Sequence, residues 1–450
     1  MSRRIDMLNG PLLGKIIAFA LPVAASSILQ QLFNSVDVAV VGKFSSPQAL
    51  AAVGSNGSLI NLMINLFVGI SVGANVVISR YIGKQDRAGM KRAISTALAV
   101  SVVSGLLLLV IGVSLARVIL EAMQTPSDVI DLSVLYLRVY FLGMPAIMLF
   151  NFTSAIFRSV GDTKRPLYCL MIGGLVNVVV NLVLVLAFHF DVLGVAIGTV
   201  LGNVVAAALV LFLLGNESGS ISFRLSKARI FRSELSEMLR IGIPAGVQSM
   251  VFSFANVFIQ ASINGFGAIA VAGSAAALNY EHYCYYIIGA FVAATTTFTG
   301  QNHGAGQMDR CRKVFWHAMW LSVVGCGVCN MFFVWQERWA IGLFTSDEAV
   351  FEYAFIRMEI ILFWQWIACS YEISAASLRG LGYSSLPALL TIFGTCVLRI
   401  GWIKFYCPTH PDFSSLMIVY PISWIITGTL VLMANRIVFR REERKMVACG

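Results

Sequence analysis

The chain has 450 residues, of which 58% are hydrophobic and only 12% are charged, and its mean hydropathy is +0.81. Soluble domains carry about 25% charged residues and about 45–50% apolar ones, so these values exclude a water-soluble enzyme and indicate a multi-span membrane protein. A net charge of +10 suggests a nucleic-acid partner in a soluble chain, whereas in a membrane protein it indicates basic loops. We therefore expect the lipid bilayer, and no nucleic acid, as the partner.

Twelve apolar segments, bounded by charged residues, Pro or Gly, follow one another along the chain. A helical span needs about 20 mostly apolar residues, and each segment reaches that length. We expect an all-α membrane protein with spans near residues 15–42, 53–79, 93–116, 132–157, 166–188, 192–215, 241–264, 273–300, 314–336, 352–378, 386–406 and 414–438.

The basic residues predict the orientation of these spans. If the N-terminus is cytoplasmic, 25 of the 32 Lys and Arg residues lie in cytoplasmic segments and four lie in outer loops, namely Lys43, Arg117, Arg338 and Lys404. Cytoplasmic loops carry an excess of Lys and Arg in membrane proteins. The sequence therefore predicts a multi-pass protein of the cell (inner) membrane with both termini in the cytoplasm.

An internal repeat divides the chain. The segment "SAIFRSVGDTKRPLYCLMIGG" from Ser154 reappears as "AASLRGLGYSSLPALLTIFGT" from Ala375, and Pro22 and Asn34 align with Pro244 and Asn256. We expect an N-terminal six-helix bundle at 1–215, a basic cytoplasmic linker at 216–239, and a C-terminal six-helix bundle with a basic tail at 240–450. Six spans per half predict a pseudo-two-fold axis along the membrane normal, as in transporters that rock two bundles about a central binding site.

Four segments also match a known family. "NGPLLGKIIAFALPVAASSILQQLFNSVDVAVVGK" at the start, "RSVGDTKRP" after the fourth span, "GQNHGAGQ" after the eighth and "LFTSDEAVFEYA" before the tenth resemble the MATE (multidrug and toxic compound extrusion) family. This family belongs to the broader multidrug, oligosaccharidyl-lipid and polysaccharide exporter superfamily. The resemblance implies efflux of varied, often cationic or aromatic compounds, driven by inward H⁺ or Na⁺.

An acid lies among amides and a hydroxyl in the first half. Asp37 is the one acid within the first six spans, and Asn177, Asn181 and Thr199 are expected at a similar depth in the same bundle. Such oxygen groups suit a proton relay or a small hard cation. The resemblance implies a coupling role for Asp37, with Asn177 and Thr199 as companions. Asn181 replaces a second acid of many members, which favours H⁺ over Na⁺.

The second half departs further from the family pattern. Some members carry a glutamate where this chain has Phe252, and charges appear instead at Glu281, Glu359 and Arg399. A charge at bilayer depth needs a partner or a function. We expect a buried ion pair between Arg399 and Glu359, with Glu281 as the alternative acid. Arg138 and Arg357 align between the halves and are interpreted as snorkelling anchors. Glu372, near a cytoplasmic end, is interpreted as a buttress.

Polar and aromatic side chains within the spans are candidates for a substrate cavity, because aromatic faces suit flat cationic drugs through cation–π contacts. The alternative is an interfacial belt and ordinary packing. The candidates are Asn34, Asn151, Asn256, Gln260, Glu281, Tyr280 and Trp364.

We therefore expect a multidrug efflux antiporter that works by alternating access as a monomer. Its expected substrates are drug-like small molecules, and it is expected to use H⁺ or Na⁺ as the coupling ion and no other cofactor. The alternatives are a lipid-linked oligosaccharide flippase and a membrane-embedded transferase or hydrolase. Five histidines give little material for catalysis. Cys326 and Cys329 form a C-x-x-C pair without a second pair or a His at ligand spacing, so neither an enzyme nor a metal site is expected.

Overall fold

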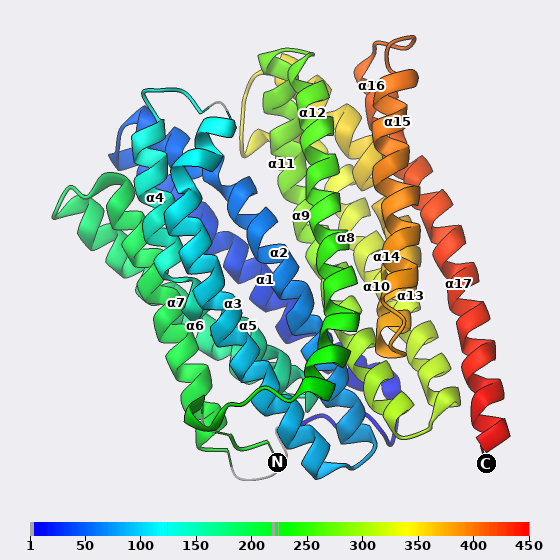
Figure 1. Cartoon of the computed structure of the whole chain (residues 1–450). Helices are drawn as coiled ribbons and strands as arrows, with labels where there is room; N and C mark the ends of the chain where they lie inside the picture. Colours follow the sequence, from blue (N-terminus) through cyan, green and yellow to red (C-terminus); the bar gives the residue numbers. More distant parts are fainter. Residues whose placement is uncertain (1–3, 124, 218–220, 224, 450) are drawn as a thin grey trace. The chain divides into compact units, whose positions relative to one another are not determined.

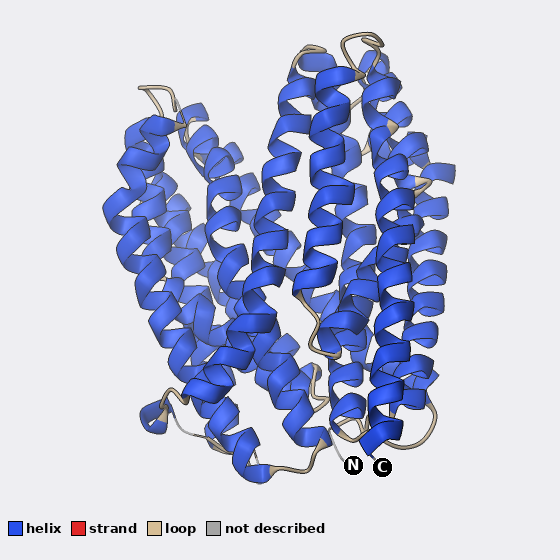
Figure 2. Ribbon diagram, turned by 45° about the vertical axis from the view of Figure 1, so that its right-hand side comes forward, coloured by secondary structure: helices blue, strands red, loops and turns tan. Residues whose placement is uncertain are grey.

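The computed structural model describes residues 4–123, 125–217, 221–223 and 225–449, and this part of the chain is helical without a β-strand (Figures 1 and 2). The helices of the first half are α1 (Leu12–Phe44), α2 (Pro47–Gly83), α3 (Arg87–Ala122), α4 (Ile130–Leu142), α5 (Met144–Ser159), α6 (Lys164–Leu186), α7 (Asp191–Gly215) and the short 3₁₀ turn η1 (Leu225–Lys227).

The second half is also helical but more often interrupted. Its elements are α8 (Arg232–Asn264), α9 (Ala268–Gly304), α10 (Met308–Trp335), α11 (Glu337–Gly342), α12 (Glu348–Arg357), the π-turn η2 (Met358–Leu362), the 3₁₀ turn η3 (Gln365–Ala368), α13 (Cys369–Gly380), α14 (Ser385–Thr391), the π-turn η4 (Ile392–Val397), α15 (Leu398–Phe405), α16 (Phe413–Met417) and α17 (Val419–Cys449).

Every predicted span corresponds to helical structure, so the expected all-α membrane fold is confirmed, although the count is not exact. Within the described residues, nine helices are long and apolar enough to cross a membrane, or ten if the bent pair α4 and α5 is one span. The fourth span bends by 46° between these two helices, where Pro145 at the start of α5 lacks a backbone donor. The tenth span is broken into α12, η2, η3 and α13.

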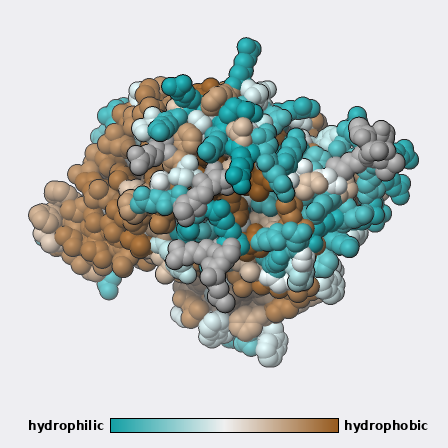
Figure 3. Space-filling model, turned by 90° about the horizontal axis from the view of Figure 1, so that it is seen from below, coloured by the Kyte–Doolittle hydropathy of each residue, from teal (hydrophilic) through white to brown (hydrophobic). Residues whose placement is uncertain are grey.

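Apolar side chains cover the sides of the helices. On α10, five exposed apolar residues recur at every fourth position, so each contacts the next along a stripe that winds slowly around the helix; they are Trp316, Trp320, Val324, Val328 and Phe332. Figure 3 looks onto a face where hydrophilic residues gather, and hydrophobic residues are visible beyond it. An apolar stripe of this length on a helix surface is typical of contact with lipid tails.

The chain folds into two compact units. Unit 1 comprises residues 1–5 and 25–246, and unit 2 comprises residues 6–24 and 247–450. The chain changes unit three times, after residues 5, 24 and 246. The second and third changes lie two residues after a repeat-related proline, Pro22 in α1 and Pro244 in α8. These units differ from the predicted bundles, because residues 6–24 belong to unit 2 and the start of α8 belongs to unit 1. The predicted linker at 216–239 lies within unit 1.

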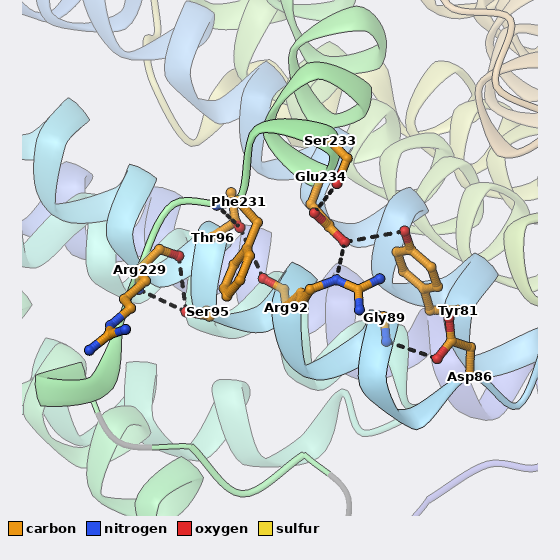
Figure 4. Close-up of polar contacts among 10 residues, drawn as sticks. All are labelled: Tyr81, Asp86, Gly89, Arg92, Ser95, Thr96, Arg229, Phe231, Ser233 and Glu234. Carbon is orange, nitrogen blue, oxygen red and sulfur yellow. Dashed lines mark hydrogen bonds and ion pairs between the residues drawn. The ribbon is translucent and has the colours of Figure 1, made fainter.

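The connection into α8 is held against α3 inside unit 1 (Figure 4). The Ser95 hydroxyl donates to the carbonyl of Arg229 (3.0 Å) and accepts from the Arg229 amide (2.7 Å), and the Phe231 amide donates to Thr96 (3.1 Å). The side chains of a helix thus satisfy the backbone of an extended segment, which would otherwise lack partners. This segment is consequently an ordered part of unit 1.

A charged contact follows at the first turn of α8. Glu234 is completely buried; it accepts from Arg92 Nε at 2.7 Å, from the Tyr81 hydroxyl at 3.5 Å and from Ser233 (Figure 4). Arg92 keeps 42% of its side chain exposed. Because a buried carboxylate needs donors, this contact fixes the start of α8 on α2 and α3. We call Arg92 and Glu234 the linker pair.

Glycines then allow the first part of α8 to pack closely on α2. A Cβ on Gly69 would lie 2.3 Å from the Gly246 amide nitrogen, and a Cβ on Gly73 would lie 2.2 Å from the Met238 carbonyl oxygen. Real side chains do not approach so closely, so the two backbones touch directly. The close approach explains why α8 belongs to unit 1 as far as Gly246.

In unit 2, the beginning of the chain is held by α9 and α10. Asn302 donates to the Met7 carbonyl (3.2 Å), and Arg310 donates to the same carbonyl (3.1 Å) and to that of Asn9 (2.9 Å). The buried ring of Phe19 meets Phe298 edge to face, with centroids 5.7 Å apart. Hydrogen bonds and packing together anchor residues 6–24 in this unit.

Candidate functional site

The candidate site in unit 1 is built from three helices. Asp37 lies on α1 and is 5% exposed. Asn177 and Asn181 lie one turn apart on α6, so both face the same direction, and Thr199 lies on α7. All four side chains are buried. We call these four residues the Asp37 cluster.

The side chains of the Asp37 cluster are in direct contact. Asn181 Nδ2 donates to Asp37 Oδ1 at 2.5 Å, and Thr199 Oγ1 and Asn177 Nδ2 lie 3.0 and 3.5 Å from Asp37 Oδ2. Asn177 Nδ2 also lies 3.2 Å from Thr199 Oγ1. The Thr199 hydroxyl is equally close, 3.0 Å, to the Val195 carbonyl, and its single proton serves one acceptor at a time. The four residues that the sequence placed at one depth therefore meet around one carboxylate.

Small residues make this meeting possible. A Cβ on Gly198 would lie 1.8 Å from Asn181 Oδ1, and a Cβ on Gly202 would lie 2.6 Å from the Gly173 carbonyl oxygen and 2.8 Å from Asn177 Cβ. Because no side chain fits at these two positions, α7 approaches α6 closely enough to bring Thr199 to Asp37. Sequence reasoning did not identify Gly198, since a glycine in an apolar segment gives no sign of what it faces.

The chemistry of the cluster is that of an acid with neutral partners. Within the described residues, Asp37 forms no ion pair with Lys, Arg or His. Asn177 Oδ1 and Asn181 Oδ1 are buried without a hydrogen-bond partner. An amide carries donors on one side and an acceptor on the other, so rotation of an Asn side chain would satisfy either a charged or a protonated Asp37. The arrangement can therefore accommodate both charge states.

Metal binding finds no support in the part of the chain that the structure describes. No group of three or more His, Cys, Asp or Glu side chains in that part could hold a metal ion. Cys326 and Cys329 are free thiols; Cys326 is buried and lies 3.7 Å from Asn330 Oδ1. These contacts are those of packed helix residues.

Unit 2 contains a different acid site. Glu281 on α9 accepts from Arg357 on α12 through both carboxylate oxygens, at 2.5 Å from Nε and 3.0 Å from Nη2. Arg357 also donates to Ser274 at 2.6 Å, and both charged side chains are at most 7% exposed. Arg357 is thus not a snorkelling anchor but the partner of Glu281. Its position near a predicted span end concealed this role in the sequence.

The predicted ion pair between Arg399 and Glu359 is wrong. Glu359 lies at an exposed position of η2, and Glu281 is taken by Arg357. Arg399 is 1% exposed and donates instead to the Ser423 hydroxyl at 3.1 Å. Span assignment gives depth but not the rotation of each helix, so it could not choose between acids at similar depth.

The other second-half acid, Glu372, is buried and accepts from the Tyr285 hydroxyl at 2.8 Å. Arg379, seven residues further along α13, donates to Gln248 at 3.2 Å. Both belong to the interior of unit 2, and these contacts join α13 to α9 and α8.

The residues proposed for a substrate cavity have unlike surroundings. Tyr280 is a core residue whose hydroxyl donates to the Ala340 carbonyl at 2.6 Å, and Glu281 is locked in its ion pair, so neither lines an open surface. The remaining candidates retain exposure: Asn34, Asn256, Gln260 and Trp364 are exposed, and Asn151 is half-buried. For the exposed candidates the substrate cavity stays a prediction.

A family model describes most of the chain. The MatE model matches residues 22–183 and 244–402, one segment in each half of the repeat. These two segments contain Asp37 and Asn177 in the first match and Glu281 and Arg399 in the second. The match covers more than half of the chain and repeats the internal duplication seen in the sequence.

Relatives and solved structures agree with this match. The chain is 25% identical over 435 residues to a Bacillus subtilis protein named Probable multidrug resistance protein YoeA, with 94% of each chain covered. It is 22% identical to Multidrug export protein MepA of Staphylococcus aureus, over 79% of this chain and 78% of that protein. The crystal structure of MATE in complex with MaL6 superposes with a TM-score of 0.92 at 21% identity, covering 99% of this chain and all of the other. The chain is therefore a multi-pass membrane transporter and not an enzyme, and it belongs to the MatE family, the multidrug and toxic compound extrusion transporters.

Proposed function

We propose that this protein is a secondary active multidrug efflux antiporter in which inward movement of H⁺ drives the export of organic compounds, with Asp37 as the coupling acid. One observation carries the proposal: a buried carboxylate that is hydrogen-bonded only by neutral groups. A carboxylate without a cationic partner gains or loses a whole charge on titration, and its neighbours must respond. The names of the relatives, multidrug resistance and multidrug export, suggest the cargo.

The hydrogen bonds suggest how titration reaches the helices. The charged form of Asp37 accepts from α6 and α7, and the protonated form has a proton to donate where Asn181 Nδ2 now lies 2.5 Å away. At least one bond must then break or an amide must rotate. Since Asn181 belongs to α6 and Thr199 to α7, protonation changes the contacts between α1 and both helices.

The same cluster favours H⁺ over Na⁺. The oxygens available to a cation are those of one carboxylate, two amides and one hydroxyl, so the site offers a single negative charge. Hard cations bind oxygen ligands, and affinity rises with ligand charge. Asn181, which is neutral, removes the second charge that would compensate the dehydration of Na⁺. A proton gradient is therefore expected to suffice.

In this proposal the protein works by alternating access as a monomer, with both termini in the cytoplasm of the cell and drug-like compounds as substrates. Asp37 takes up a proton from outside, and the changed packing of α1, α6 and α7 releases the substrate outward. A flippase for lipid-linked oligosaccharides is the second candidate, but the described residues offer no observation that favours it.

The test measures efflux of a fluorescent organic cation from vesicles in which a pH gradient and a Na⁺ gradient are imposed separately. Asp37→Asn should abolish efflux at normal expression, whereas Asp191→Asn, an exposed acid at the start of α7, should leave it unchanged. The pH gradient alone should drive the wild type. Full efflux by Asp37→Asn, or dependence on Na⁺ alone, would contradict the proposal.

A further inference from the structure

Arg399 is a buried cation without an acid. It lies on α15, directly after the π-turn η4, and only 1% of it is exposed. The span that contains it begins at Ser385, so Arg399 lies about 21 Å along the helix at 1.5 Å per residue. The span ends at Phe405, so Arg399 lies about 9 Å inside that end by the same rise, where a charge without a partner is still costly.

The contacts of Arg399 are a hydroxyl and two aromatic rings. Its Nε donates to Ser423 at 3.1 Å, and its Cζ lies 4.1 Å from the ring centroid of Tyr420 and 5.4 Å from that of Phe252. Nη2 is buried and has no hydrogen-bond partner. Within the described residues, no carboxylate forms an ion pair with Arg399.

The neighbouring charges do not neutralise it. The buried acid Glu281 is already bound by both oxygens to Arg357, and the Arg357 guanidinium lies 5.9 Å from the same Tyr420 ring. Tyr420 thus lies beside two guanidinium groups, and the Glu281 carboxylate pairs with only one of them, Arg357. Cation–π contacts are weak attractions, and they do not offset the desolvation of a buried charge.

We propose that Arg399 anchors a binding site for organic anions, namely the carboxylate of an aromatic acid or of a zwitterionic drug. This inference rests on the proposed efflux function and adds a substrate class to it. A guanidinium binds a carboxylate through two parallel N–H groups, and Nη2 is free to donate. The rings of Tyr420 and Phe252 provide flat apolar surfaces for the aromatic part of the ligand.

Phe252 is the cover of this site. It lies over the guanidinium from α8, and its side chain is only half-buried. A rotation of this one ring exposes a face of Arg399 that Tyr420 does not cover. The burial of Arg399, which is 1% exposed, favours a soluble organic acid over a phospholipid headgroup, since headgroups lie at the membrane surface.

The test uses dansylglycine, a fluorescent aromatic carboxylate, with its neutral analogue dansylglycinamide, added to the purified full-length protein in a neutral detergent. Wild type should bind dansylglycine saturably and more tightly than the amide. Arg399→Met should weaken dansylglycine binding by about tenfold or more, because a charge-assisted bidentate pair is lost, and should leave the amide unaffected. Unchanged binding of dansylglycine by a folded Arg399→Met protein would overturn the proposal.

A second pair of variants keeps the test informative if Arg399→Met does not fold. Phe252→Glu places a carboxylate beside the guanidinium and should block dansylglycine binding by forming an internal ion pair. Phe252→Gln, whose side chain has the shape of Glu without its charge, should bind dansylglycine. Equal binding by the two variants contradicts an anion site at Arg399. Displacement of the probe by phosphatidylglycerol, but not by phosphatidylcholine, would identify a lipid ligand and overturn the organic-acid assignment.

Binding in detergent needs no ion gradient, so this test is separate from that of the proposed function. Asp37→Asn should retain dansylglycine binding while losing efflux. Efflux of cations without any binding of dansylglycine would refute the anion site alone, and efflux by Asp37→Asn with intact binding would refute the coupling role alone.

Discussion

The two units place opposite charges in their interiors. In unit 1, Asp37 is surrounded by two amides and a hydroxyl; in unit 2, Glu281 is bound by a guanidinium, and a second guanidinium, Arg399, has no acid. The same duplicated fold thus supports a lone acid in one unit and an excess of positive charge in the other. The charge of the lone acid is balanced by no cation, whereas the charge of an acid held by a bidentate arginine is balanced by its partner.

The repeat-related arginines show how the difference arises. Arg138 is exposed and donates to the Val113 carbonyl at 3.2 Å, while Arg357, its counterpart, is buried against Glu281. The acid came from a different helix in each unit, α1 in one and α9 in the other. Duplication therefore preserved the positions of the basic residues but not their electrostatic roles.

The largest expected effect comes from removing one partner of the buried ion pair between Arg357 and Glu281 in unit 2. Arg357→Met leaves Glu281 buried and unpaired, and should destabilise the protein by about 3–5 kcal/mol. The double variant Arg357→Met with Glu281→Met should recover most of this loss, since it removes both charges. Thermal unfolding of the purified proteins measures the change. If Asp37→Asn lowered Tm as much as Arg357→Met, the contrast between the two acids would be lost.

The next effect concerns the packing that forms the Asp37 cluster. Gly198→Ala places a methyl group where Asn181 Oδ1 now lies, and should both impair efflux and cost about 1–3 kcal/mol of stability through overpacking. Gly215→Ala, in the same helix with nothing within 4 Å of the added methyl, should be neutral or stabilising by about 0.5–1 kcal/mol. Equal behaviour of the two variants would mean that the close approach of α7 to α6 is not needed.

A smaller effect is expected at the linker pair, where the acid is buried and the base is partly exposed. Arg92→Met leaves Glu234 without its cationic partner and should lower Tm less than Arg357→Met, because water reaches the site. Arg117→Met is the control, since Arg117 pairs with Glu121 and Asp131 at the surface with every partner more than half exposed. A lower Tm for Arg117→Met than for Arg92→Met would contradict the role of the linker in unit 1.

The smallest effect is a pH dependence at the end of α7. Burial acts to raise the pKa of Glu217, but Arg165 and Arg4 outweigh it and hold that pKa below its ordinary value of 4.5. A lowered pKa contributes stability above the ordinary value, and this contribution is lost as the pH falls through the lowered pKa. The Tm difference between wild type and Glu217→Gln should therefore be present near about pH 7 and shrink on acidification, whereas Glu121→Gln should show little difference at either pH.

The sequence predicted the helices and the Asp37 cluster because both follow from the length of apolar segments and from the depth of each residue along its span. Apolar length defines a span, and the rise per residue then places Asp37, Asn177 and Thr199 at one level. Whether an acid faces Arg399 depends instead on helix rotation and on the interruptions η2 and η4, which shift the faces of the tenth and eleventh spans. The partner of Glu281 was missed for the same reason.

The exchange of chain segments between the units also lay beyond sequence reasoning. Apolar length does not reveal that glycines such as Gly69 and Gly246 meet at the backbone, or that Asn302 binds the Met7 carbonyl. The repeat correctly placed Pro22 and Pro244 in equivalent positions, and two of the three changes of unit, after residues 24 and 246, follow them by two residues. The predicted linker boundaries were drawn from charge, which marks where the chain is basic rather than where it changes unit.

This exchange has a consequence for dissecting the protein. A cut in the basic linker yields two polypeptides, and neither contains a whole unit. The first polypeptide keeps residues 6–24, which belong to unit 2, and the second keeps the first turns of α8, which belong to unit 1. Each fragment alone would lack residues that pack in the unit to which most of it belongs. We therefore expect the two halves to fold only when they are co-expressed, because each half supplies residues that complete a unit of the other. An isolated half does not contain a complete unit.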